Sequence, residues 1–353
     1  MKDDSLLMLL APEMLNEAGE RFRILQEIHA SQPVGRHLLI VQTKLSESTI
    51  RRHIEYLEKA GLLIAKPKGM ILTEKGESLL IPLSHYFQKN PTRGEIEKKL
   101  AHILSMERVI LLKGDADQSE TVKRNISEEA ALILMRWIRD GDVVAISGGE
   151  IMAGVAGAMP PFHMSLDVLP ACGGLGRKVE YLPNVVAARL AERVGGNYHI
   201  IHVPEGLSPE LYRQVKKALP QSKVMDTLFP KVRILLTGIN DFFDMMKWRD
   251  FPADVKERLV RDKAVGEGLG LFSDQNGKVL YRLYNGGITK EDIPTIPHIL
   301  LAAGGRHKGR AILAMARTGI RGTLITDEGA ANEILAVSDS NIGGCKNHDK
   351  NRY

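Results

Sequence analysis

The sequence predicts an α/β protein of two domains, an N-terminal winged helix-turn-helix followed by a larger, mostly parallel α/β domain. Its 353 residues are too many for one ordinary hydrophobic core, so two or three domains are expected. Residues 13–72 contain three helical patterns and then a hairpin pattern. From residue 108 onward, short apolar runs alternate with amphipathic helical patterns, the rhythm of a parallel sheet covered by helices.

The composition is that of a globular protein that does not cross a membrane. Apolar residues make up 44% of the chain and charged residues 26%. The sequence contains no apolar run of about 18 residues, and "MKDDSLLMLLAPEM" carries acids where a signal peptide needs positive charge. Cys172 and Cys345 are too few for a disulfide framework. We therefore expect a cytoplasmic protein.

Most of the net charge of +5 falls in the first domain. Between Arg36 and Lys75, eight Lys or Arg residues stand against four acids, and eight minus four leaves an excess of +4. Such a patch favours a polyanionic partner, although a patch of this size is also typical of ordinary solvated surface.

Three helices are expected in the first domain. Apolar residues recur at helical spacing over residues 13–30, and a second, short helix fits residues 35–42. The third helix is expected over residues 47–59, because Ser46 is a favourable N-cap and Gly61 a favourable C-terminal stop.

A hairpin follows the third helix. The stretch "LLIAKPKGMILTEKG" predicts two strands joined by a tight turn at Pro67-Lys68-Gly69. Three helices and a hairpin are the elements of a winged helix-turn-helix.

The third helix has the arrangement of a DNA-recognition helix. Ile50, Ile54 and Leu57 share one face, which leaves an outward polar face with arginine near its N-terminal end. An arginine there can bond guanine in the major groove, and lysines of the hairpin can reach phosphates. An ordinary amphipathic surface helix is the alternative for this helix taken alone. The residues expected to contact DNA are Ser48, Thr49, Arg51, Arg52, Lys66 and Lys68.

Seven apolar runs are candidate strands of the second domain. They are "RVILLKG" (108–114), "DVVAIS" (142–147), "LDVLPA" (166–171), "YHIIHVP" (198–204), "VRILLTG" (232–238), "HILLAA" (298–303) and "GTLITD" (322–327). Before them, residues 75–107 are expected to be helical with a break near Asn90-Pro91. The expected boundaries are a DNA-binding domain at 1–90, a helical connector at 91–107, the large domain at 108–336 and a disordered tail at 337–353.

Three of these strands end in glycine pairs, in "AISGGE" (145–150), "PACGGLG" (170–176) and "AAGGRHKG" (302–309). Ligands of open α/β sheets bind at the carboxyl ends of strands, and glycines there let backbone N–H groups approach an anion. The three loops predict a crevice for an anion or a sugar phosphate. The alternative is that the glycines only permit tight turns.

Other candidates for this crevice are Arg249, Glu267 and Lys308. Lys308 could meet a phosphate as a point charge. Glu267 could accept hydrogen bonds from sugar hydroxyls, or could be a paired surface carboxylate; the sequence leaves both open.

With both halves described, the chain resembles the SorC/DeoR-type bacterial transcriptional regulators, most closely those that control glycolytic genes. The resemblance covers about residues 14–336. Its marks are "VGRHLLIVQTKLSESTIRRHIEYLEKAGLL", "VVAISGGEIMAGVA", "LPACGGLG", "PNVVAARLAE", "IPHILLAAGGRHKGRAI" and "GTLITDEGAANEIL". It implies a winged helix-turn-helix joined to an effector domain related to sugar-phosphate isomerases and glucosamine-6-phosphate deaminases. It also implies operator DNA as partner, dimers or tetramers, and control by a phosphorylated sugar, fructose 1,6-bisphosphate in the closest relatives.

The resemblance implies an effector site whose residues are only partly present in this chain. The relatives' first loop reads Gly-Gly-Thr-Thr, whereas this chain has Glu150 and Ile151 after the glycines. Cys172 replaces an arginine, Leu182 replaces a glutamine, and the pair Trp248-Arg249 replaces two arginines, while Glu267 and Lys308 match. The full set of expected effector-binding residues is Gly148, Gly149, Glu150, Ile151, Cys172, Gly173, Gly174, Leu182, Trp248, Arg249, Glu267 and Lys308. Because a carboxylate has entered one phosphate pocket, we expect a monophosphorylated sugar to fit better than the bisphosphate.

The alternative is a sugar-phosphate isomerase or deaminase with an accessory DNA-binding domain. Those deaminases carry an Asp-Gly-His loop motif, and that tripeptide does not occur in this sequence. Likeness of fold alone does not establish activity. We therefore expect a repressor of carbohydrate genes that is not an enzyme, has no catalytic residues and requires no metal or cofactor.

Overall fold

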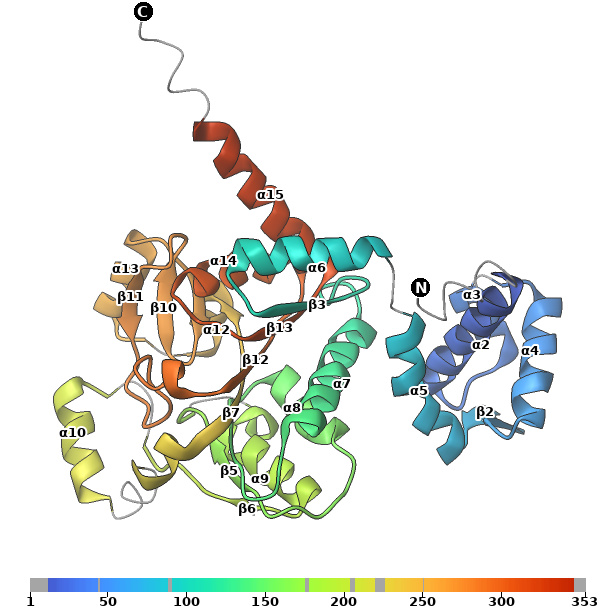
Figure 1. Ribbon diagram of the computed structural model, residues 1–353, viewed down its shortest axis with the longest axis horizontal. Coiled ribbons are helices and arrows are strands. Elements are labelled where there is room, and N and C mark those ends of the chain that lie inside the picture. Colours follow the sequence, from blue (N-terminus) through green and yellow to red (C-terminus); the bar gives the residue numbers. More distant parts are fainter. Residues whose placement is uncertain are drawn as a thin grey trace, which may run out of the picture. The chain divides into compact units, whose positions relative to one another are not determined.

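The computed structural model describes residues 12–43, 45–87, 91–174, 178–203, 207–219, 226–249 and 251–345. The chain divides into two compact units, residues 1–91 and 92–353 (Figure 1). No helix in these described ranges is both long and apolar enough to cross a membrane.

The first unit is a winged helix-turn-helix. Its elements are α2 (Pro12–Ser31), α3 (Arg36–Thr43), α4 (Glu47–Lys59), β1 (Leu63–Lys66), β2 (Gly69–Leu72) and α5 (Glu74–Phe87). The hydroxyl of Ser46 caps α4 by accepting from the N–H of Thr49 at 3.2 Å, as predicted. Ile50, Ile54 and Leu57 face a core shared with α2 and the hairpin, which holds α4 by its apolar side.

The hairpin forms the wing. Its strands pair from Leu63↔Leu72 to Lys66↔Gly69, so Pro67 and Lys68 form the two-residue turn. Gly69 has a φ of +132°, and a Cβ there would lie 2.8 Å from the backbone of Val34. The wing therefore packs its second strand closely against the segment before α3.

The second unit is built on a seven-stranded parallel sheet in the order β3-β13-β12-β7-β4-β5-β6. Its strands are β3 (Arg108–Leu112), β4 (Val143–Ile146), β5 (Asp167–Pro170), β6 (Asn197–Tyr198), β7 (Val232–Gly238), β12 (His298–Ala302) and β13 (Thr323–Asp327). Its flanking helices are α6 (Pro91–Leu104), α7 (Glu120–Trp137), α8 (Glu150–Ala158), α9 (Pro183–Val194), α10 (Pro209–Ala218), α14 (Gly309–Arg317) and α15 (Glu328–Cys345).

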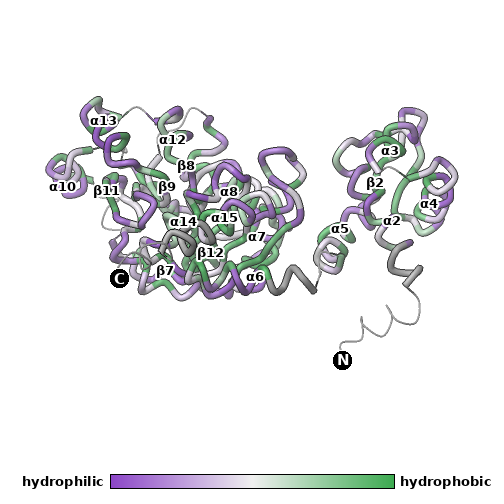
Figure 2. The backbone as a smooth tube through the Cα atoms, turned by 90° about the horizontal axis from the view of Figure 1, so that it is seen from above, coloured by the Kyte–Doolittle hydropathy of each residue, from purple (hydrophilic) through white to green (hydrophobic). Residues whose placement is uncertain are grey.

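Alternate residues of the strands enter two separate cores. In β4, Val143 and Ala145 join the core under α6, α14 and α15, whereas Val144 and Ile146 join the core under α7, α8 and α9 (Figure 1). Burial on both faces explains why these strands read as continuous apolar runs in the sequence. The outlying helices α10 and α13 (Ala253–Arg261) are largely hydrophilic (Figure 2).

Two predictions for this unit are wrong in part. The strand expected over residues 198–204 is limited to Asn197–Tyr198, which add to the sheet edge beside β5. The tail expected to be disordered from residue 337 instead continues α15 to Cys345, because Ser338 and its neighbours extend the helix that packs on α14. Residues 346–353 lie outside the described part of the chain.

A four-stranded antiparallel sheet was not predicted. It has the order β11-β10-β9-β8, and with two helices it forms a module over residues 240–282, here called the antiparallel module. Its elements are β8 (Asn240–Asp241), α12 (Phe242–Trp248), α13, β9 (Ala264–Gly268), β10 (Leu271–Asp274) and β11 (Val279–Arg282). Phe242, Leu259 and Phe272 form its own small core.

Candidate functional site

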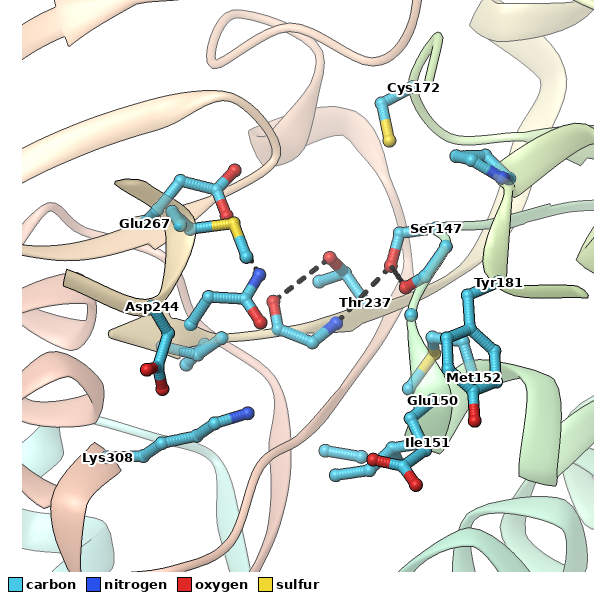
Figure 3. A pocket seen from close by; sticks show the side chains of 18 of the residues that line it. Ser147, Glu150, Ile151, Met152, Cys172, Tyr181, Thr237, Asp244, Glu267 and Lys308 are labelled. Carbon is cyan, nitrogen blue, oxygen red and sulfur yellow. Dashed lines mark hydrogen bonds between the residues drawn. The ribbon is translucent and has the colours of Figure 1, made fainter. Parts of the chain in front are cut away.

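A cavity of about 400 Å³ lies at the carboxyl ends of the parallel strands. The strand order places it where the chain changes direction: after β4 the chain continues outward to β5 and β6, whereas β7 leads to β12 and β13 on the other side. Open α/β sheets bind ligands at such a switch point. One wall is made by the loops after these strands and the other by the antiparallel module (Figure 3).

The cavity gathers eleven of the twelve residues expected to bind an effector. They are Gly148, Gly149, Glu150, Ile151, Cys172, Gly173, Gly174, Leu182, Arg249, Glu267 and Lys308. Trp248 ends α12, and its side chain lies outside the described part of the structure.

The first glycine loop presents free backbone donors. Among the described residues, the N–H groups of Gly148, Glu150 and Ile151 have no hydrogen-bond partner, whereas the N–H of Gly149 donates to the carbonyl of Tyr181 at 2.9 Å. Gly149 caps α8 with a φ of +105° and a ψ of 168°, a conformation that is essentially restricted to glycine. These donors stand at a helix N-terminus, where an anion is favoured.

Glu150 brings its own carboxylate to this helix end. Its side chain is half exposed and accepts from the ammonium of Lys123, on α7, at 3.4 Å. Lys123 also binds Glu120 at 2.7 Å, and hydrogen bonding to Glu120 is the main cause that raises the pKa of Lys123. A negatively charged pair of acids sharing one lysine therefore lies beside the free donors.

The third glycine loop differs from the prediction that its N–H groups face a ligand. The N–H of Gly305 donates to Asp327 at 2.8 Å, that of Arg306 to Asp115 at 3.2 Å, and that of His307 to Asp117 at 2.9 Å. The protein's own carboxylates thus occupy this loop. The loop lines the cavity with Gly304 and with the side chains of His307 and Lys308.

The second loop is held by close packing. The N–H of Gly173 donates to the carbonyl of Asn285 at 2.9 Å, and a Cβ on Gly173 would lie 2.4 Å from that oxygen. Glycine is needed at this position for a tight approach of two backbones, as in the alternative interpretation of the glycine pairs.

Lys308 is a cation available to a ligand. Burial lowers the pKa of Lys308 below its usual value, although Asp244, Asp117 and Glu150 act in the opposite direction. Its ammonium forms no hydrogen bond or ion pair with any residue that the structure describes. Figure 3 shows this side chain extending into the cavity, on the side where Glu150 and Ile151 of α8 also lie.

Glu267 is buried, and its carboxylate is already bound by other groups of the protein. It is 2% exposed and accepts from Asn240 at 2.8 Å and from the N–H of Gly270 at 2.8 Å. Its other contact is with Arg249, 3.5 Å away. These contacts hold the Arg249 guanidinium at the cavity wall, so Glu267 is a paired carboxylate in a buried position.

Six further charged or titratable residues of the cavity were missed. They are Asp117, Lys123, Lys178, Tyr181, Asp244 and His307. His307 contacts the carboxylates of both Asp117 and Asp244 through its two ring nitrogens. Asp117 and Lys123 lie outside the glycine loops, and their only sequence signal is that they follow β3 closely.

The described side chains that line the cavity are balanced in charge. Asp117, Glu150, Asp244 and Glu267 stand against Lys123, Lys178, Arg249 and Lys308, with His307 in addition. Most of these charges are committed to one another. Among the described lining cations, Lys308 and Lys178 form no ion pair with a described residue, and Lys178 lies over the Tyr181 ring, 5.2 Å from its centroid.

The first unit leaves its expected DNA contacts exposed. Ser48, Arg51, Lys66 and Lys68 are exposed, and the Arg51 side chain forms no hydrogen bond or ion pair with the residues that the structure describes. Arg52 lies 3.7 Å from the carboxylate of Glu17 on α2, and the hydroxyl of Thr49 lies 2.8 Å from that of Ser46. Arg51 and the wing lysines are therefore freer to meet DNA than Arg52 and Thr49.

His53 on α4 was also missed. It is fully buried between Arg21 and Glu20, at 3.3 and 2.8 Å. It fixes α4 to α2 and completes the inward face formed by Ile50, Ile54 and Leu57.

Comparison with known proteins agrees with both halves. Residues 90–336 match the family model described as "Putative sugar-binding domain", and residues 18–87 match the CggR N-terminal DNA binding domain. The central glycolytic genes regulator of Priestia megaterium is 34% identical over 92% of this chain and 96% of its own length. That of Bacillus subtilis is 31% identical over the same shares.

Solved structures give the same result. A SorC family transcriptional regulator from Enterococcus faecalis is 31% identical, with a TM-score of 0.62 over 68% of this chain and 99% of that chain. The full-length sorbitol operon regulator of Klebsiella pneumoniae shares the fold at 16% identity, with a TM-score of 0.62 over 86% of this chain and 94% of that chain. The chain therefore belongs to the sugar-binding-domain family of SorC-type transcriptional regulators, together with the central glycolytic genes regulators.

Proposed function

We propose that this protein is a repressor of carbohydrate genes, glycolytic genes in particular, whose operator binding is modulated by a sugar carrying a single phosphate. The observation that carries the proposal is the pairing of free N–H donors at the start of α8 with the uncommitted ammonium of Lys308 in one cavity. A phosphate between them would gain several charge-assisted hydrogen bonds, each worth roughly 1.5–3 kcal/mol.

Glu150 is the reason for preferring one phosphate to two. Its carboxylate is half exposed, lies at the same helix end as the donors, and shares Lys123 with Glu120. A second phosphate brought close to it would meet a like charge in a partly desolvated site, and such pairs are costly. The hydroxyl groups of a sugar, in contrast, can donate to this carboxylate.

Operator recognition is assigned to the first unit. Arg51 on the exposed face of α4 is positioned to read base edges, and Lys66 and Lys68 of the wing are positioned to contact phosphates. One such unit reads only a half-site, so we propose that a homodimer or homotetramer binds a near-palindromic operator.

Effector and operator are coupled by linkage. If the sugar phosphate weakens operator binding by some factor, operator DNA weakens sugar-phosphate binding by the same factor. A sugar phosphate that weakens operator binding is an inducer, and one that strengthens operator binding is a co-repressor.

An isomerase or deaminase activity is the rival function. The acids that line the cavity are engaged with partners: Glu267 with Arg249, Glu150 with Lys123, and Asp117 with His307. An engaged carboxylate is poorly placed to act as a general base. Turnover assays with hexose phosphates and amino-sugar phosphates decide between a regulator and an enzyme, since a regulator leaves these compounds unchanged.

The proposed function is tested by fluorescence anisotropy with a labelled operator from the protein's own promoter region. Fructose 6-phosphate, glucose 6-phosphate and fructose 1,6-bisphosphate are added separately to the complex. We expect a monophosphate to change operator affinity at lower concentration than the bisphosphate. A preference for fructose 1,6-bisphosphate would contradict the single-phosphate assignment, and no response to any of them would contradict the effector class.

A further inference from the structure

His307 joins the two walls of the effector cavity. Its Nδ1 contacts Oδ1 of Asp117, in the loop after β3, and its Nε2 lies 3.1 Å from Oδ2 of Asp244 on α12. Its backbone N–H also donates to Asp117, at 2.9 Å. The neighbouring residue is Lys308, so the same short turn carries both the link between the walls and the cation expected to meet the effector.

The chemistry of these contacts depends on the charge of the ring. An ionised carboxylate only accepts hydrogen bonds, and a neutral imidazole has a single N–H. Both contacts of His307 are therefore hydrogen bonds only when the ring is an imidazolium, with both nitrogens protonated. Loss of one proton leaves one carboxylate facing an acceptor nitrogen and weakens the link between the walls.

The charges around His307 keep its partners ionised. Burial acts to raise the pKa of Asp244, but the hydrogen bond and charge of Lys247 and the charges of His307 and Lys308 outweigh it and lower that pKa. On the other wall, Asp115 accepts the N–H of Arg306 next to His307, and Lys123 and Glu150 stand across the cavity. The groups facing the ring are thus two carboxylates in contact, with Lys308, Lys247, Arg306, Asp115, Lys123 and Glu150 farther away.

We propose that His307 is a positioning residue that, as an imidazolium, fastens the antiparallel module to the rest of the cavity and couples effector binding to the uptake of a proton. The inference rests on the proposed function, because it concerns the same cavity. An anion bound beside Lys308 adds negative charge next to the ring, so the complex holds the ring proton more tightly than the free protein. Affinity for the effector then rises as pH falls and falls as pH rises.

The experiment is isothermal titration calorimetry of the full chain with fructose 6-phosphate between about pH 6 and pH 9, the range around histidine titration. Each titration is repeated in buffers of different ionisation enthalpy, which gives the number of protons taken up for each ligand bound. The proteins compared are the parent, His307→Gln and the control His199→Gln. His199 also contacts a carboxylate, Asp167 at 2.8 Å, but Asp167 begins β5, at the end of the sheet away from the cavity.

The ionisation of the sugar phosphate itself is common to all three proteins, and so is any contribution from Lys308. As pH rises, the parent and His199→Gln should lose affinity more steeply than His307→Gln. The difference in slope should be up to about tenfold in affinity per pH unit, because one extra proton is linked to binding. Asp244→Asn removes one of the two carboxylates but keeps the ring, so we expect it to reduce the extra proton uptake without abolishing it. Thermal unfolding of each variant checks that it is folded.

Three outcomes decide the matter. The inference fails, and the proposed function stands, if His307→Gln takes up as many protons on binding as the parent does. It also fails if raising the pH weakens binding by the parent no more than binding by His307→Gln. If the parent binds neither fructose 6-phosphate nor inorganic phosphate at any pH, the proposed function fails and the inference fails with it. A parent that binds with an extra proton, lost only in His307→Gln, supports both.

Discussion

At the scale of single residues, the cavity is defined by which charges are committed and which are free. Glu267 and Arg249 are committed to each other, whereas Lys308 has no partner among the residues that the structure describes. Glu150 is in an intermediate position, because it shares Lys123 with Glu120. Selectivity for the effector should therefore follow the residues that change this balance.

The first prediction concerns the residues that replace the relatives' phosphate contacts. Changing Glu150 and Ile151 to threonine together with Cys172→Arg removes a negative charge, adds a positive one and adds two hydroxyl donors. We expect the affinity for fructose 1,6-bisphosphate to rise by at least about tenfold, since one charge-assisted contact is worth more than 1.4 kcal/mol. Calorimetry with mono- and bisphosphates measures the change.

Lys308→Met is the matched contrast to that triple variant. It removes the cation proposed to meet the single phosphate, so it should weaken monophosphate and bisphosphate alike. If the triple variant leaves the preference between the two ligands unchanged, Glu150 is not the residue that excludes the second phosphate.

The second prediction separates base reading from phosphate contact in the first unit. Arg51→Ala should cost about 1–3 kcal/mol of operator affinity and relax the preference at one base pair, whereas Lys68→Ala should weaken all sequences equally. Arg52→Ala should cost less than Arg51→Ala, because the Arg52 guanidinium is already 3.7 Å from Glu17. Anisotropy titrations with the operator and single-base variants measure these effects.

Arg261→Ala is the control for that series, since Arg261 is exposed on α13 of the second unit. Operator binding by Arg51→Ala and Arg52→Ala that equals the parent's would mean that α4 is not the recognition helix.

At the scale of elements, the start of α8 depends on one backbone conformation. Gly149 has a φ of +105° at the N-cap of α8, and the next two residues, Glu150 and Ile151, line the cavity. Gly157, at the other end of the same helix, has ordinary helical geometry and nothing within 4 Å of a Cβ added there. The two glycines make a matched pair.

The third prediction uses this pair. Gly149→Ala should lower the free energy of unfolding by about 1–3 kcal/mol, because alanine is strained at that φ, and should weaken phosphate binding. Gly157→Ala should raise the free energy of unfolding by about 0.5–1 kcal/mol, because alanine favours the helix more than glycine does. Urea unfolding followed by circular dichroism compares them, and equal stabilities would show that the α8 start is not conformationally restricted.

At the scale of the whole molecule, the chain carries a DNA-binding unit and a sugar-binding unit. Helix-turn-helix proteins bind near-palindromic operators as dimers because each unit covers one half-site. The fourth prediction is therefore that the protein is a dimer or a tetramer at micromolar concentration, with and without operator. Sedimentation equilibrium measures this, and a monomer in both conditions would rule the assembly out.

The sequence by itself determined the elements whose signals are local. Helical spacing, the Ser46 cap and the Pro67-Lys68 turn predicted the first unit to within one or two residues, and the apolar runs predicted six strands of the parallel sheet. The antiparallel module was missed although Asn276-Gly277 joins β10 to β11, since its short strands alternate weakly and depend on contacts with one another.

The cavity was located from the sequence, because strands of a parallel sheet end at the same edge and the glycine loops follow three of them. The tertiary structure alone decided which donors are free. Asp115 and Asp117 close the third glycine loop from almost two hundred residues away in the chain, and His307 meets Asp117 and Asp244 from two separate elements. Such contacts have no signal in local spacing, because hydrogen bonds and charge pairs form between whatever side chains the packing of distant segments brings together.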